Sequence, residues 1–156
     1  MKNKKILLIL ICTMSLFLIT GCGKKEAITT KDFNKITEEA ELIITDAKDQ
    51  FQDKDYVKDA SIASSVAGWQ IEFYTFDSAD SAKEMYSKNK SDFEAAKDNS
   101  KKSSYVEKNK DNYAEYTVTA DGYYMHICRI DETVIYLKVQ DKYQDEVKGI
   151  LKNLGY

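Results

Sequence analysis

The side chains best suited to chemistry in this chain are a histidine and a cysteine that stand two positions apart. His126 is the single histidine of the 156 residues, and Cys128 follows it after one residue. Residues two apart on a β-strand point to the same side of the sheet. If residues 123–130 form a strand, the imidazole and the thiol therefore share one surface.

Two kinds of reactive site would use this pair. A histidine beside a thiol and a carboxylate is a nucleophile and base arrangement, with Glu115 on the neighbouring predicted strand as the carboxylate. A metal site needs three or four ligands, which His126, Cys128, Glu115 and Glu72 would supply. A single sheet face offers no obvious oxyanion donors, however, and the chain has no paired-ligand spacing such as C-x-x-C. The pattern therefore predicts no catalytic residue, no metal and no cofactor.

A hairpin positions the histidine and the cysteine. Asp121-Gly122 lies between two alternating apolar patterns and predicts a two-residue turn, because both turn positions need positive φ. This turn pairs Val118 with Met125, so apolar residues of both strands share one face, which we expect to be the core face. For the next connection a three-residue loop, 131–133, is expected, because it pairs Met125 with the apolar Val139.

The opposite face then carries polar and aromatic side chains from several strands. Tyrosine buries a large area while keeping a polar tip, and it is enriched where proteins bind partners. We therefore expect this surface, the predicted binding face, to recognise a ligand or a partner unless a helix covers it. Its expected members are Tyr74, Glu115, Thr117, Tyr124, His126, Cys128, Tyr136 and Lys138.

Three amphipathic helices should pack on the sheet. Apolar residues recur at steps of three and four over 31–51, 78–97 and 142–154, which is the spacing of a helix with one buried stripe. If one helix crosses to the other side of the sheet, it covers the predicted binding face. The expected N-caps are Thr30, Asp77 or Ser78, and Asp141, and the expected C-terminal stop of the last helix is Gly155.

Alternating patterns predict the strands of this sheet. They run over 69–76, 113–120, 123–130 and 134–139, and residues 56–66 suggest a short edge strand. Residues 98–112 are polar and rich in lysine, and we expect a solvated loop with a minor strand. The order of elements indicates an α+β fold with a mainly antiparallel sheet of four or five strands.

The N-terminus forms a separate unit. Lys2, Lys4 and Lys5 give a positive start, residues 6–19 are mostly apolar, and Ile19-Thr20-Gly21-Cys22 follows. A charged start before a short apolar run is typical of a secretory signal, and a membrane span would need about 20 apolar residues. The last four residues resemble the lipobox of bacterial lipoproteins, in which an aliphatic residue and two small residues precede an obligatory cysteine.

The resemblance implies a defined maturation and location. In that family the cysteine thiol, here that of Cys22, receives a diacylglyceryl group, and a peptidase then cuts before this cysteine. The implied organisation is a removed signal peptide over 1–21, a lipid-anchored tether over 22–29 and a single domain over 30–156. The domain would face the extracytoplasmic side of the cell membrane. An uncleaved signal anchor, or cleavage that leaves Cys22 free, are the alternatives.

Composition narrows the function of this domain. Removal of Lys2, Lys4 and Lys5 would shift the net charge from −3 to −6, and an acidic domain is a poor match for nucleic acid. Cys12 leaves with the signal and Cys22 carries the lipid, so Cys128 has no partner for a disulfide. Arg129, the only arginine, falls on the core face, where it reaches the sheet end or meets an acidic partner.

The sequence thus predicts a lipoprotein that acts as a non-enzymatic binding or accessory module. It would contact membrane lipid through Cys22, and an envelope protein or a small ligand through the predicted binding face or residues 98–112. The alternative is a small enzyme or redox protein that uses Cys128 and His126.

Overall fold

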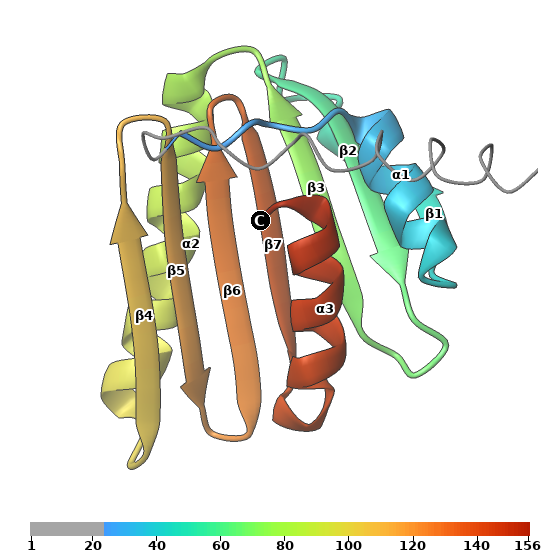
Figure 1. Ribbon diagram of the computed structural model, residues 1–156. Helices are drawn as coiled ribbons and strands as arrows, with labels where there is room; N and C mark the ends of the chain where they lie inside the picture. Colours follow the sequence, from blue (N-terminus) through green and yellow to red (C-terminus); the bar gives the residue numbers. More distant parts are fainter. Residues whose placement is uncertain (1–23) are drawn as a thin grey trace, which may run out of the picture.

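A computed structural model describes residues 24–156 as one antiparallel sheet with helices on both sides (Figure 1). The helices α1 and α3 cover what we term the front face, and α2 covers the rear face. None of the described helices is long and apolar enough to cross a membrane. The helices are α1 (Thr30–Glu39), α2 (Ala79–Asn99) and α3 (Gln144–Leu154), with short 3-10 turns η1 (Lys48–Phe51) and η2 (Asp141–Tyr143).

The sheet consists of two meanders that meet in its middle. The first three strands form one meander and the last four form the other, and β3 pairs with β7 where they join. The strand order is β1-β2-β3-β7-β6-β5-β4, so β1 and β4 are the edges. The strands are β1 (Ile43–Asp46), β2 (Val57–Ser64), β3 (Gln70–Phe76), β4 (Ser103–Asn109), β5 (Tyr113–Ala120), β6 (Tyr123–Ile130) and β7 (Thr133–Gln140).

The predicted α+β class with an antiparallel sheet and three helices is confirmed, but the sheet has seven strands instead of four or five. The two underestimated strands are the edges. All seven residues of β4 are exposed, so this strand has no buried side that would produce an alternating pattern. Its backbone nevertheless pairs with β5 along its whole length, from Ser103 opposite Ala120 to Asn109 opposite Ala114.

The predicted helix over 31–51 is wrong beyond Glu39, where α1 ends. A capping box between Thr29 and Asp32 starts α1, so the N-cap is Thr29 and not Thr30. Glu41 adopts a positive φ of 61°, which ends the helical path. The following residues, Ile43-Ile44-Thr45, are β-branched and pair with β2 as the edge strand β1.

The other two helices largely confirm their predictions. Ser78 caps α2, whose buried residues are Ala82, Tyr86 and Phe93. The last predicted helix begins with the 3-10 turn η2, so Asp141 is not the N-cap of α3. The C-terminal stop is confirmed, because Gly155 ends α3 with a φ of 82°.

The predicted register between β5 and β6 is confirmed, whereas the predicted register between β6 and β7 is wrong. Asp121-Gly122 forms the expected two-residue turn, and Val118 pairs with Met125. The next turn also has two residues, because Asp131 adopts a φ of 47° and Ile130 pairs directly with Thr133. Helices cover both faces of β6 and β7. The apolar residues of these two strands therefore lie on both sides of the sheet, and their pattern does not define a register.

Candidate functional site

The shifted register divides the predicted binding face between the two sides of the sheet. Glu115, Thr117, Tyr124, His126 and Cys128 lie on the front face, since Thr117 pairs with His126 and His126 pairs with Leu137. The remaining three residues lie on the rear face, where Tyr136 pairs with Ile127 and Lys138 with Met125. The rear-face members are Tyr74, Tyr136 and Lys138.

Three of the five front-face members are buried, and Glu115 and Thr117 are half-buried. Tyr124, His126 and Cys128 are at most 3% exposed. The Nδ1 atom of His126 lies 2.9 Å from the Thr117 hydroxyl, whereas its Nε2 atom is buried without a hydrogen-bond partner. Burial lowers the pKa of His126 to about 4, so the imidazole is neutral at physiological pH.

This environment gives no support to a reactive centre at His126 and Cys128. Burial raises the pKa of the Cys128 thiol to about 12, so the nucleophilic thiolate is not formed near neutral pH. Glu115 forms an ion pair with Lys108 of the edge strand at 3.0 Å. Among residues 24–156, no group of three or more histidine, cysteine, aspartate or glutamate side chains is placed to hold a metal ion.

A pocket opens on the rear face between η1 and the N-terminal half of α2. Its volume is about 140 Å³. Aromatic rings form its walls: the Phe51 and Tyr74 rings meet edge to face at 5.5 Å, and the Tyr56 and Phe76 rings stack at 6.4 Å. Met85 of α2 adds a flexible apolar wall, and the charged side chains at the opening are Lys54, Glu84 and Lys88.

Beside this pocket lies a carboxylate that its neighbours hold in place. The Tyr74 hydroxyl donates to Oε2 of Glu72 at 2.5 Å, and the Gln70 amide donates to Oε1 at 2.8 Å. Glu72 stands opposite Ile62 on β2 and opposite Tyr136 on β7, so it lies in the middle of the sheet. Burial and the Glu72 charge raise the pKa of Tyr74 far above its usual value, so this hydroxyl remains a donor.

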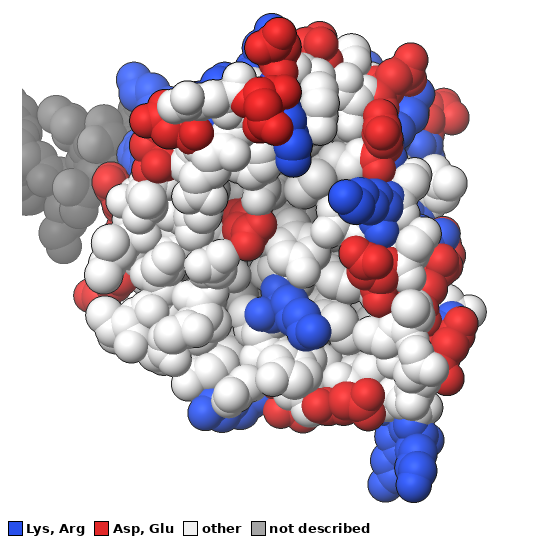
Figure 2. Space-filling view, turned by 180° about the vertical axis from the view of Figure 1, so that it is seen from behind, with Lys and Arg blue, Asp and Glu red and all other residues white. Residues whose placement is uncertain are grey.

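The rear face carries few charged side chains away from its border (Figure 2). Figure 2 shows the rear face with charged side chains dense along its border and sparse in its middle. The β1 residue Ile43, 59% exposed, belongs to the same face through its pairing with Ser64. We define the rear-face site as the aromatic pocket together with Glu72 and its neighbours Ile62 and Tyr136.

No family model, curated protein sequence or solved structure matches this chain. We therefore infer the function of the rear-face site from its chemistry. Sites for drug-sized molecules usually measure about 300–1,000 Å³, whereas a cavity of about 150 Å³ holds one benzene ring. A pocket of about 140 Å³ thus fits a single aromatic or branched aliphatic side chain.

Sequence patterns identified only part of this site. Tyr74 and Tyr136 belong to the predicted binding face, and Glu72 is one of the four possible metal ligands. Phe51 and Tyr56 were not predicted, because they reach the pocket only through the fold of η1 and the following turn against β2. The signal that was available is local: two aromatic residues, Tyr74 and Phe76, stand two positions apart on one short strand and therefore share a face.

Proposed function

We propose that this chain is a lipoprotein held on the extracytoplasmic side of the cell membrane by a diacylglyceryl group on Cys22. We further propose that its domain is a non-enzymatic binding module for an envelope polypeptide. The residues Ile19-Thr20-Gly21-Cys22 support the anchor, and they lie outside the described residues. The rear-face site supports the binding role.

The chemistry of the rear-face site favours a polypeptide that presents an apolar side chain close to a basic one. The apolar side chain would fill the pocket that Phe51, Tyr74 and Met85 line. The basic group would meet the Glu72 carboxylate, which is already oriented by Tyr74 and Gln70 and needs no rearrangement on binding. Binding energy at protein interfaces is concentrated in a few anchor residues, enriched in Trp, Tyr and Arg, that fill well-packed pockets near the centre.

The anchor is tested by feeding cells a clickable fatty acid. We expect the native protein to incorporate the label and to sediment with membranes, and Cys22→Ala to lose both properties completely, because two acyl chains give stable anchoring. Cys12→Ala is the matched control, since it removes a thiol from the same N-terminal segment. Label on the Cys22→Ala protein, or its absence from both native and Cys12→Ala proteins, would contradict the proposal.

The binding role is tested by photo-crosslinking in cells. A photoreactive amino acid at Ile43, on the rear face, should yield a discrete covalent adduct, and one at Lys148, exposed on α3, should not. Glu72→Gln keeps the shape of the side chain and the acceptor for Tyr74 but removes the charge. We expect this variant to reduce the Ile43 adduct several-fold, whereas Glu146→Gln, exposed on α3 and away from the rear face, should leave it nearly unchanged. Equal adduct yields from Ile43 and Lys148, or an Ile43 adduct that is unchanged in Glu72→Gln, would overturn the proposal that a partner binds at the rear-face site.

A further inference from the structure

The chain segment that follows Cys22 is docked on one end of the sheet. The backbone N–H of Lys25 donates to Oδ1 of Asn112 at 3.3 Å, and Nδ2 of Asn112 donates back to the Lys25 carbonyl at 2.6 Å. The Lys25 ammonium group lies 5.2 Å from the centre of the Tyr113 ring. Ile28 packs against the front core three residues later. Figure 1 shows this segment running across the end of the sheet before α1 begins.

Asn112 is itself held firmly in position. It is only 9% exposed, and its Nδ2 atom also donates to the Asp131 carboxylate at 3.2 Å. The backbone N–H of Asp131 donates to the Asn112 carbonyl at 2.8 Å, which ties the β4–β5 and β6–β7 turns together. The side chain that docks Lys25 thus belongs to a rigid pair of turns.

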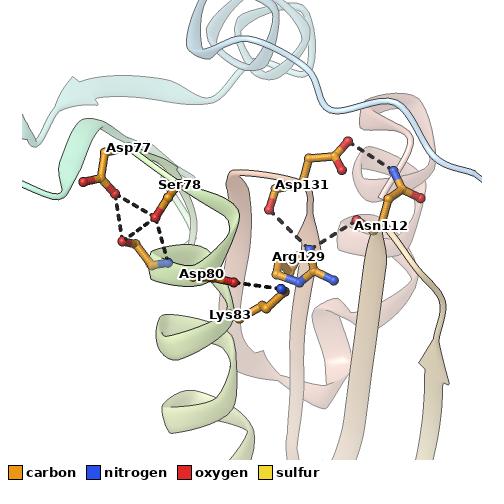
Figure 3. A network of polar contacts seen from close by, with 8 residues as sticks. Asp77, Ser78, Asp80, Lys83, Asn112, Arg129 and Asp131 are labelled. Atoms are coloured by element: carbon orange, nitrogen blue, oxygen red, sulfur yellow. Dashed lines mark hydrogen bonds and ion pairs between the residues drawn. The ribbon is translucent and has the colours of Figure 1, made fainter.

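Arg129 supports the same pair of turns from inside the sheet. It is 4% exposed, and its Nη1 atom donates to the carbonyls of Asn112 and Asp131, each at 3.3 Å (Figure 3). The only arginine of the chain therefore reaches the sheet end, as one of the two predictions for it stated. Arg129, Asn112 and Asp131 form what we term the docking clip.

The docking clip shortens the expected tether. Residues 22–29 were predicted to link the lipid to the domain, but Lys25 is already fixed to Asn112. An extended chain spans at most about 3.6 Å per residue, so the three steps from Cys22 to Lys25 cover no more than about 11 Å. A lipid on Cys22 would hold the docking clip close to the bilayer.

We propose that the end of the sheet that carries the 110–112 and 131–132 turns faces the lipid surface, and that the docking clip fixes this orientation. The proposal rests on the anchor at Cys22 proposed above. Phe76 lies at the same end, because its N–H donates to the Glu132 carbonyl at 2.8 Å. The rear-face pocket therefore opens close to the membrane, where it meets partners that lie along the bilayer. The turn at Asp121-Gly122 points away from the membrane.

Two exposed lysines on either side of β4 offer a matched pair of reporter positions. Lys102 precedes the strand and Lys110 follows it, and both are exposed. Eight residues at about 3.3 Å each separate the two positions by about 26 Å along the strand. A thiol-reactive fluorophore on Lys102→Cys or Lys110→Cys would label one site, since Cys128 is buried and Cys22 carries the lipid.

The experiment measures quenching by nitroxide headgroup lipids in vesicles that contain the full lipidated protein. We expect several-fold stronger quenching at Lys110→Cys than at Lys102→Cys. Asn112→Ala should bring the two values closer together, and the neighbouring Asn109→Ala should not. A Gly-Ser insertion between Lys24 and Lys25 leaves Asn112 untouched and should weaken quenching at Lys110→Cys.

Equal quenching at the two positions, or stronger quenching at Lys102→Cys, would overturn the orientation. An unchanged difference in Asn112→Ala would overturn the role of the docking clip. These outcomes require protein that is bound to vesicles and carries fatty acid. Protein that is neither acylated nor bound contradicts the anchor itself, so the two proposals fail in distinguishable ways.

Discussion

Phe73→Ala should lower the free energy of unfolding by about 3–5 kcal/mol, a large part of the about 5–15 kcal/mol that stabilises a typical domain. Phe73 is fully buried in the middle of β3. Its ring stacks on Phe33 of α1 at 5.0 Å and meets the ring of Tyr156 edge to face at 6.3 Å. The truncation therefore loosens α1 and the C-terminus from the sheet at once. Urea unfolding followed by circular dichroism measures this loss.

An exposed apolar residue provides the control for Phe73→Ala. Ile43→Ala on the edge strand β1 should change the free energy of unfolding by less than about 1 kcal/mol, because the side chain is 59% exposed. Phe33→Ala removes the stacking partner, so its effect and that of Phe73→Ala should not add in the double variant. Additive effects, or a loss below about 1 kcal/mol for Phe73→Ala, would contradict the packing of α1 on β3.

Those parts of the fold that local signals specify were predictable from the sequence. Asp121-Gly122 fixes a two-residue hairpin turn because of its backbone requirements, and the register of β5 on β6 follows from it. The segment 78–97 carries an N-cap and a clear apolar stripe, and it forms α2. In both cases neighbouring residues carry all the information that the structure uses.

The failures occur where tertiary contacts decide between two local solutions. Ile36, Ala40, Ile43 and Ala47 fit a helical period, but residues 43–46 pair with β2 as a strand. Both faces of β6 and β7 are apolar because helices cover both sides of the sheet. The alternation of apolar residues therefore could not distinguish a two-residue from a three-residue turn. Coverage by helices on both sides is a property of the whole fold and cannot be inferred from one strand.

The same error explains the partial prediction of the site. The one-residue shift between β6 and β7 moved Tyr136 and Lys138 to the opposite side of the sheet from His126. Tyr74 still shares a face with Tyr136, because Tyr136 pairs with Glu72, which stands two residues before Tyr74 on β3. What the sequence could not provide is the pocket beside them, which depends on how η1 and α2 approach the same strand.

His126 should make the domain sensitive to mild acid. Burial lowers the pKa of His126 to about 4 in the folded protein, below the value of 6.5 that an exposed histidine has. Between these two pH values the unfolded chain binds a proton and the folded protein does not, so stability falls as the pH falls. The slope approaches about 1.4 kcal/mol per pH unit, and the total loss between pH 6.5 and pH 4 is about 3 kcal/mol. Urea unfolding at a series of pH values between 7.5 and 4.5 measures this pH dependence of the free energy of unfolding.

Two substitutions separate His126 from the carboxylates that also titrate in acid. His126→Leu and His126→Gln both lack a titrating group, and each should lose the slope between pH 6.5 and pH 5. The Thr117 hydroxyl, which lies 2.9 Å from the imidazole in the native protein, is half-buried and can bond to water in the leucine variant. Glu115, Lys25 and Lys108 are the charged side chains that act on the imidazole, and they are the same in all three proteins. Equal pH slopes in the native protein and both variants would contradict a lowered pKa for the buried imidazole.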